Sequence, residues 1–189
     1  MERCGFRLVS FSLIPQRRAM KITLLIIGII VGLMLLAGLT IYLIGRAQPE
    51  RHTARITFTL PKPRAVVWAA LTDYAAMPQW WPAVKAIRFE TRSNGDIITW
   101  NTDQRGQVIG FRTTAQQAPA HLVREITGDN LPFGGTWTYD LTEENGGTRV
   151  NLTEDGFVKP PFFRGMMRLM VKPDATMRDF EKNFTAWVR

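Results

Sequence analysis

The chain has 189 residues, of which 46% are hydrophobic, and its formal net charge at neutral pH is +8. The charge divides evenly: five basic and one acidic residue precede a long apolar segment, and nineteen basic and fifteen acidic residues follow from Arg46 onward. The basic residues of the second part are scattered and form no run or stripe, which argues against a nucleic-acid-binding protein.

Residues 1–21 form a short basic tail without hydrophobic periodicity. Met20 and Lys21 directly precede the apolar segment and look like a natural initiation site, so translation from Met1 or from Met20 remains open. Cys4 in this tail is the only cysteine of the chain. No disulfide can therefore form within one chain, thiol chemistry is excluded for the remainder, and the redox compartment stays undecided.

Residues 22–44 carry no charge and predict a transmembrane helix. Their length corresponds to about 35 Å of helix, which is enough to cross a bilayer. A cleaved signal peptide is the alternative, since residues 45–47 loosely match a small-x-small cleavage site. The apolar core exceeds the roughly 7–15 residues of secretory signals, so an uncleaved anchor followed by a polar linker over residues 45–51 is favoured.

The charges around this segment predict its orientation. Five basic residues precede it, and Arg46, Arg51 and Arg55 follow it. This asymmetry favours an inside N-terminus and a folded domain in the periplasm or another extracytoplasmic space. If translation starts at Met20, only Lys21 and the terminal amine remain on the inner side, and the charges no longer support this orientation.

Residues 52–189 predict a single domain that begins with a strand. Apolar and polar residues alternate over Thr53–Leu60, which is typical of a half-buried strand. Pro61 and Pro63 end it, and two short helices are expected over residues 66–71 and 77–81, with Asp73 placed to cap a turn between them. Turn residues then separate six predicted strands: Val84–Thr91, Asp96–Asn101, Gln107–Ala115, His121–Thr127, Gly135–Glu143 and Thr148–Glu154.

A long helix is predicted from Pro161 to Val188, and helices segregated from an antiparallel sheet indicate an α+β fold. Pro173 lies inside this helix, where proline costs about 3 kcal/mol, so we expect a kink or brief interruption near residues 171–174. The first half would lie near a cavity mouth and the second half in the core. The apolar positions recur at helical spacing and form one predicted stripe: Phe163, Met166, Met167, Met170, Met177, Phe180, Phe184 and Trp187.

This order of elements resembles the START-like (SRPBCC) superfamily, over about residues 52–189. The matching segments are Val67-Trp-Ala-Ala-Leu-Thr-Asp-Tyr74, Met77-Pro-Gln-Trp-Trp-Pro82, Gly134-Gly-Thr-Trp-Thr-Tyr139 and Asn151-Leu-Thr-Glu-Asp-Gly156, together with the terminal helix. The superfamily includes polyketide cyclase/aromatase-like proteins, lipid-transfer domains and coenzyme-Q-binding proteins. The resemblance implies a helix-grip fold, in which a seven-stranded sheet curls around the long helix and leaves a cavity. No catalytic residue set is shared by all members.

Aromatic and methionine side chains are expected to line this cavity, because they offer broad and adaptable apolar walls. They also fill ordinary cores, and for any single residue core packing is the more frequent role. For the set as a whole a lined pocket is favoured. The predicted cavity residues are Trp80, Trp81, Trp100, Phe111, Arg124, Trp137, Tyr139, Glu154, Phe163, Met166, Met170, Met177 and Phe180.

Two of these residues are charged. By strand alternation Glu154 shares a face with Leu152, and Arg124 shares a face with Leu122, so both point towards the cavity. An ion pair between Glu154 and Arg124 would offset the desolvation of each charge, and a polar ligand head could insert there. The alternative places Glu154 at the strand end in water.

His52 and His121 are the only histidines, and both are expected at surface or turn positions. No HxxxH, CxxC or HExxH spacing is present, so a metal site made of histidine and cysteine is excluded. The sequence also lacks GxSxG, a glycine-rich phosphate loop and a cysteine nucleophile in the domain. No catalytic residue, metal or cofactor is therefore predicted.

Three functions fit these observations. The leading hypothesis is a membrane-anchored, non-enzymatic binding or carrier domain for a lipid or another hydrophobic small molecule. The second is a cyclase- or aromatase-type enzyme with Glu154, Arg124, Tyr139 and Arg112 as its polar groups. The third is a protein-interaction module whose cavity is collapsed.

Overall fold

The computed structural model describes residues 14–128, 131–170 and 172–188. These residues divide into two compact units, within residues 1–41 and residues 42–189. The first unit consists of most of α1 (Ile14–Ala47). Within α1 the stretch Arg17–Ala47 is long and apolar enough to cross a membrane, and an 18-residue window of it has a mean hydropathy of 2.8 and no buried residue. The predicted apolar helix is thus confirmed, although it begins before residue 22.

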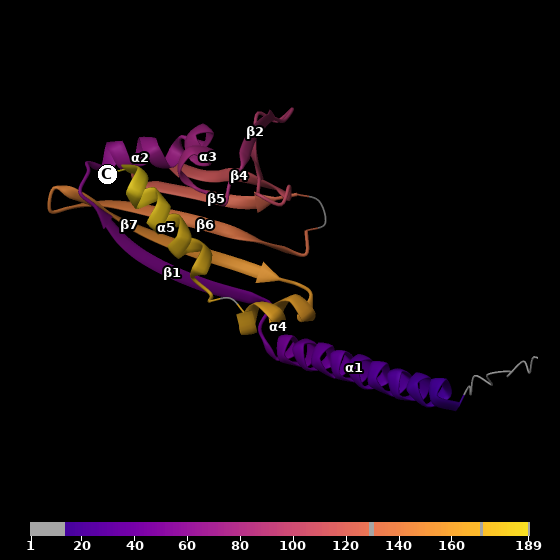
Figure 1. Cartoon of the computed structure of the whole chain (residues 1–189). Coiled ribbons are helices and arrows are strands. Elements are labelled where there is room, and N and C mark those ends of the chain that lie inside the picture. The colour runs from indigo at the N-terminus through magenta and orange to yellow at the C-terminus, as the bar shows by residue number, and fades with distance from the viewer. Residues whose placement is uncertain (1–13, 129–130, 171, 189) are drawn as a thin grey trace, which may run out of the picture. The chain divides into compact units, whose positions relative to one another are not determined.

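The second unit is built on one antiparallel sheet with the strand order β1-β7-β6-β5-β4-β3-β2, as Figure 1 shows. Strands β2 to β7 each pair with their neighbours in the sequence, and β1 pairs with β7 at one edge of the sheet. The seven strands confirm the predicted number. Their bounds are β1 (Arg51–Leu60), β2 (Ala86–Thr91), β3 (Ile97–Thr102), β4 (Val108–Gln117), β5 (His121–Thr127), β6 (Phe133–Glu144) and β7 (Gly147–Val158).

The β6–β7 hairpin illustrates how local sequence determines strand pairing. Asn145 and Gly146 form its two-residue turn, with φ angles of 51° and 78°. Two successive positive φ angles match the twist of antiparallel strands, and asparagine followed by glycine tolerates them best. The turn sets the register in which Trp137 lies opposite Glu154 and Tyr139 lies opposite Leu152.

Two short helices follow β1, as predicted: α2 (Arg64–Thr72) and α3 (Met77–Trp80), joined by the 3-10 turn η1 (Tyr74–Ala76). The side chain of Asp73 accepts a hydrogen bond of 3.2 Å from the backbone amide of Ala76. The predicted cap at Asp73 is therefore confirmed. The turn places Tyr74 and Met77 at the edge of the sheet's inner face, where both contribute to the site described below.

The C-terminal helix is interrupted as predicted, into α4 (Pro161–Met170) and α5 (Ala175–Val188). Figure 1 shows α5 crossing the inner face of the sheet. Met177, Phe180 and Phe184 of the predicted stripe are buried against that face, together with Val188, and belong to the core. Trp187, the last residue of the predicted stripe, is 44% exposed and does not.

The prediction of one continuous apolar stripe is wrong for α4. Only Gly165 of α4 is buried, whereas Phe163, Met167 and Met170 are exposed. The physical reason is the break itself, because a helix that stops and restarts loses the rotational phase on which the periodicity argument depends.

The core of the second unit lies between α5, α2, α3 and the inner face of the sheet. Phe180 is fully buried at its centre, and Phe184 stacks on it at a ring distance of 5.2 Å. Aromatic rings from α3, from Trp81 directly after it and from β6 surround Phe180 at distances between 5.4 and 5.7 Å.

Candidate functional site

A cavity of about 310 Å³ opens between the sheet and the start of α5. Its walls come from α3, from the inner face of β3 to β7, and from the first turn of α5. Apolar surface dominates, with five polar or charged side chains among it. The lining residues are Met77, Trp81, Asn101, Ile109, Phe111, Arg124, Ile126, Phe133, Gly135, Trp137, Tyr139, Glu154 and Thr176.

The structure brings six of the thirteen predicted residues together in this lining: Trp81, Phe111, Arg124, Trp137, Tyr139 and Glu154. Trp80, Met177 and Phe180 lie just behind it in the core, where each is buried. Trp81 and Trp137 both pack on Phe180, so the cavity wall and the core form one continuous aromatic layer.

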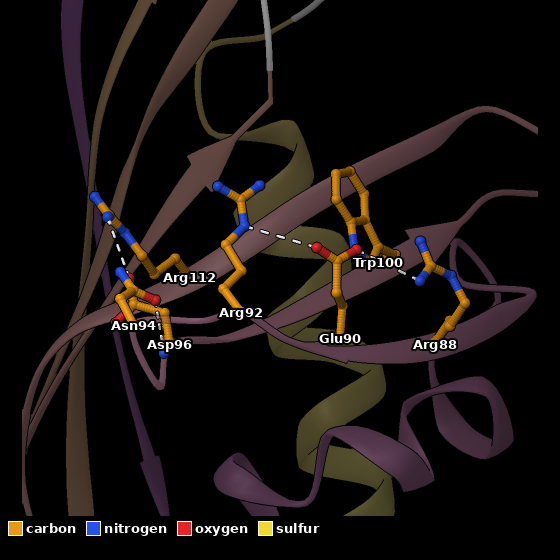
Figure 2. A network of polar contacts seen from close by, with 7 residues as sticks. All are labelled: Arg88, Glu90, Arg92, Asn94, Asp96, Trp100 and Arg112. Carbon is orange, nitrogen blue, oxygen red and sulfur yellow. Dashed lines mark hydrogen bonds and ion pairs between the residues drawn. The ribbon is translucent and has the colours of Figure 1, made fainter.

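Trp100 is a correction, because it lies on the opposite face of the sheet. Its indole nitrogen donates a hydrogen bond of 2.8 Å to Glu90, and the guanidinium of Arg88 lies 5.5 Å from its ring. Figure 2 shows Trp100 among the charged side chains of this outer face. The face of β3 that points into the cavity carries Thr99 and Asn101 instead, so the usual rule that apolar residues point inwards fails on this strand.

Phe163, Met166 and Met170 are a second correction, since they lie outside the cavity lining. All three belong to α4, whose apolar side faces away from the protein. A second cavity, of about 270 Å³, lies beside α4 at the break between the two helices. Its lining includes Met167, Arg168 and Pro173, together with His52 at the start of β1.

Arg124 is the most unusual residue of the main cavity. Its side chain is buried, with an exposed fraction of 7%. The guanidinium donates a hydrogen bond to the hydroxyl of Thr99 and lies 3.9 Å from the centre of the Tyr74 ring. Among the described residues, no carboxylate lies within ion-pair distance of it, and its Nε atom has no hydrogen-bond acceptor. A cation–π contact compensates part of the desolvation cost of the charge, but the site retains a positive charge that a bound anion would neutralise.

The predicted ion pair between Arg124 and Glu154 is wrong. Arg124 lies opposite Trp137 on β6, and Trp137 in turn lies opposite Glu154 on β7. The two charged residues are therefore separated by two strand spacings, about 10 Å, with an indole between them. Both still line the same cavity, at opposite sides of Trp137.

Glu154 has a different partner. One of its carboxylate oxygens lies 3.6 Å from the Nε2 atom of His52, and its side chain is about a quarter exposed. His52 was expected at the surface, yet it shares the alternation of Ala54 and Ile56, and this signal could have placed it on the inner face. Since His52 lines the second cavity and Glu154 the main one, this pair lies between the two cavities.

Sequence reasoning missed the other lining residues: Met77, Asn101, Ile109, Ile126, Phe133, Gly135 and Thr176. Ile109 and Ile126 share the strand faces of Phe111 and Arg124, so alternation alone could have identified them. Asn101 carried no such signal. Its side-chain oxygen is buried and has no hydrogen-bond donor among the described residues, which adds an acceptor to the cavity wall.

Tyr139 supplies a neutral polar group to the cavity. Its phenol is buried, which raises its pKa well above the ordinary value of 10.0, and the charge of Arg124 reverses only part of this rise. The phenol therefore stays protonated at physiological pH and can donate a hydrogen bond, but it cannot act as a base there.

This pKa shift predicts a difference in alkaline stability. Above pH 10 the tyrosine ionises in the unfolded chain but not in the folded one, so each further pH unit costs the wild type up to about 1.4 kcal/mol of unfolding free energy. A Tyr139→Phe variant should lack this contribution. Denaturant unfolding of both proteins at about pH 9 and about pH 11 would measure how much unfolding free energy each loses. Equal losses in the wild type and the variant would contradict the prediction.

No cluster of three or more histidine, cysteine, aspartate or glutamate side chains that could hold a metal occurs in the part of the chain that the structure describes. The chemistry that the cavity offers is instead one buried cation, one phenol, one amide, one carboxylate and one aliphatic hydroxyl in an apolar enclosure. Such a set suits recognition of a hydrophobic molecule that carries an anionic or hydrogen-bonding group.

Comparisons with known proteins agree with this architecture. The di-domain ARO/CYC BexL from the BE-7585A biosynthetic pathway superposes with a TM-score of 0.59 and 11% identity, covering 77% of this chain and 51% of BexL. The present chain therefore spans about half of that protein. The ZhuI aromatase/cyclase from a Streptomyces strain gives a TM-score of 0.57 and 12% identity, covering 73% of this chain and 93% of ZhuI. Ara h 8.0201 superposes with a TM-score of 0.53 and 17% identity, covering 73% of this chain and 97% of Ara h 8.0201.

At these identities the structural matches establish the fold alone. A comparison with curated protein sequences found no match. A family profile described as polyketide cyclase/dehydrase and lipid transport matches residues 51–186, which include every strand and every lining residue of the main cavity. The chain therefore belongs to the polyketide cyclase/dehydrase and lipid transport family, within the START-like (SRPBCC) superfamily.

Proposed function

We propose that this chain is a membrane-anchored binding or carrier domain for a small hydrophobic molecule with an anionic head group. The ligand would lie between the sheet and α5, with its apolar part against Trp81, Trp137 and Phe111. Its head group would contact Arg124. The observation that carries this proposal is the buried guanidinium, which faces an apolar cavity and has no carboxylate partner among the described residues.

The size of the cavity limits the ligand. At about 310 Å³ it lies at the lower end of the roughly 300–1,000 Å³ range of small-molecule sites. A single-chain or few-ring compound suits this volume better than a lipid with two acyl chains. An anionic head group at Arg124 could also accept a hydrogen bond from the phenol of Tyr139, since Arg124 and Tyr139 line the same cavity.

The proposed anchor is the apolar stretch of α1. Its composition and length suit a transmembrane helix, and a tether would keep the cavity close to the phase in which hydrophobic ligands concentrate. By the distribution of flanking charges, we assign the folded domain to the periplasmic or extracytoplasmic side.

Binding can be tested with two ligands that differ only in the head group. A medium-chain fatty acid and the alcohol of the same chain length would be titrated into the full chain in detergent, with tryptophan fluorescence as the signal, because Trp81 and Trp137 line the cavity. The acid is expected to bind at least about 10-fold more tightly, since only it can neutralise Arg124. Equal affinities, or no saturable binding by either, would contradict the proposal.

An enzyme of the cyclase or aromatase type is the second candidate, because Arg124, Tyr139 and Glu154 all line the cavity. Tyr139 stays protonated, so the base would have to be Glu154, which lies next to His52. The two functions are distinguished by Glu154→Gln, which would abolish turnover of a polyketide-like substrate in an enzyme but would not weaken the binding of an anionic ligand by a carrier.

A further inference from the structure

The helix α4 has an inverted amphipathic arrangement. At 100° per residue, its apolar side chains occupy one face and its arginines the opposite face. In an ordinary surface helix the apolar face packs against the core. In α4 the opposite face packs against the protein: Gly165 is buried, and only 9% of the Arg164 side chain is exposed. The outward face consists of Phe162, Phe163, Met166, Met167, Leu169 and Met170.

The exposure of this outward face is large. Leu169 is 59% exposed and Met170 is 77% exposed, and both phenylalanines and Met167 are also exposed. Its aromatic and methionine side chains are of the kind that contacts lipid or another apolar partner. The packing of α4 explains why this face is not turned inwards, because Arg164 makes several hydrogen bonds that hold the opposite face against the protein.

Those bonds join α4 to the last turn of α1 and to the end of β7. The Nε atom of Arg164 donates a hydrogen bond of 3.0 Å to the backbone oxygen of Gly45, and its Nη1 atom donates one of 2.9 Å to the oxygen of Val158. Gly45 packs so closely on the Pro161 backbone that a Cβ atom at position 45 would overlap the Pro161 oxygen. The start of α4 therefore lies at the level of Gly45.

If α1 spans a bilayer, the position of Gly45 indicates where the hydrocarbon layer ends. Leu43 and Ile44 are the last apolar residues of the uncharged segment, and Arg46 follows directly. The boundary between hydrocarbon and water should therefore lie close to Gly45. Since Pro161 and Arg164 contact this residue, the start of α4 lies close to that boundary.

The segment that contains α4 is basic, although Glu50 lies 3.6 Å from the Arg164 guanidinium, and its net positive charge favours an anionic membrane surface. Lys159, Arg164, Arg168 and Lys172 are basic, and no acidic residue occurs from Gly156 to Pro173. Arg168, Lys159 and Lys172 are exposed and free to approach lipid phosphates. A helix with a basic polar side and a phenylalanine- and leucine-bearing apolar side is typical of interfacial membrane binding.

We infer that α4 is an interfacial membrane helix, whose apolar face inserts among the acyl chains of the bilayer that holds α1. This inference rests on the proposed membrane anchor. It also brings the second cavity, which Arg164, Met167 and Arg168 help to line, to the level of the lipid head groups. The domain would thus contact the membrane at two places, the anchor and α4.

The test measures the depth of single labels in the membrane. In a Cys4→Ser background, which leaves no native cysteine, cysteines are introduced singly by Met170→Cys, Arg168→Cys, Ser93→Cys and Leu33→Cys. Each full-length variant carries an environment-sensitive fluorophore in vesicles of phosphatidylcholine and phosphatidylglycerol with nitroxide groups on the acyl chains. Met170 is highly exposed, so its replacement removes no core packing.

We expect the label at position 170 to emit at shorter wavelength and to be quenched several-fold more strongly than the label at position 93. Position 168, on the polar face of the same helix, should be quenched less than position 170. Position 33, in the middle of the apolar segment, reports on the anchor itself. The inference would be overturned if the label at position 33 were strongly quenched while the label at position 170 were quenched no more than the label at position 93. This result would leave the membrane anchor intact.

Two further outcomes would also overturn it. An unquenched label at position 33 would remove the membrane anchor and the role of α4 together. Efficient cross-linking between cysteines at position 170 of two chains, without quenching, would show that a second copy covers the apolar face instead of lipid.

Discussion

Replacement of Arg124 by methionine is expected to lower the affinity for an anionic lipophile by about 10²- to 10³-fold, because truncating one partner of a buried charge pair typically costs about 2–5 kcal/mol. The fold should keep nearly its full stability. The variant loses a hydrogen bond to Thr99, but it also removes a buried charge that has no carboxylate partner among the described residues. These effects oppose each other, so we expect the free energy of unfolding to change by about 1 kcal/mol or less.

Arg112→Met is the matched control for this prediction. Arg112 lies on the outer face of the sheet, where its guanidinium donates a hydrogen bond of 2.8 Å to Glu125, and Figure 2 shows it beside Asp96. The same chemical change on this face should leave ligand affinity unchanged. Fluorescence titration and denaturant unfolding of both variants would separate binding from stability; equal affinity losses in the two variants would refute the assignment of Arg124.

Replacement of Phe180 by alanine is expected to destabilise the domain by about 3–5 kcal/mol, as is typical for loss of a fully buried phenylalanine. Its ring packs against five aromatic side chains, each at a ring distance below 6 Å: Trp80, Trp81, Trp137, Tyr139 and Phe184. Because single domains have only about 5–15 kcal/mol of net stability, this single change should remove a large part of it.

The control for Phe180→Ala is Trp187→Ala, on the same helix. Trp187 is 44% exposed, so the larger truncation should have the smaller effect. Urea unfolding of the full chain in detergent, followed by near-ultraviolet circular dichroism, would compare the two midpoints. If Phe180→Ala shifted the midpoint no more than Trp187→Ala, α5 would not be the centre of the core.

Much of the fold could be predicted from the sequence, because its signals are local. Turn residues such as Asn145-Gly146 mark the hairpins, alternation marks β1, and Pro173 marks the break between α4 and α5. The position of α5 against the sheet also followed, since Met177, Phe180 and Phe184 form a buried stripe within one uninterrupted helix.

The errors arose where a local pattern was extended across an interruption or across strands. The stripe on α4 was assigned to the cavity by continuing helical phase through Pro173, whereas the break turns that face outwards. Trp100 was placed inwards because it is apolar, yet on β3 the cavity face carries Thr99 and Asn101. The predicted Arg124–Glu154 ion pair is wrong for a third reason. Strand alternation correctly places both side chains on the cavity side of the sheet, but Trp137 on the intervening strand separates the two charges.

We expect the cavity beside Arg124 to hold an acidic lipophile. The most direct measurement is mass spectrometry of the full chain, purified in mild detergent from the membranes of the cells that make it, for the wild type and for Arg124→Met. An acidic hydrophobic compound is expected to co-purify with the wild type and to be depleted in the variant. Absence of any bound lipophile from both proteins, or an equal amount of the same compound in both, would contradict it.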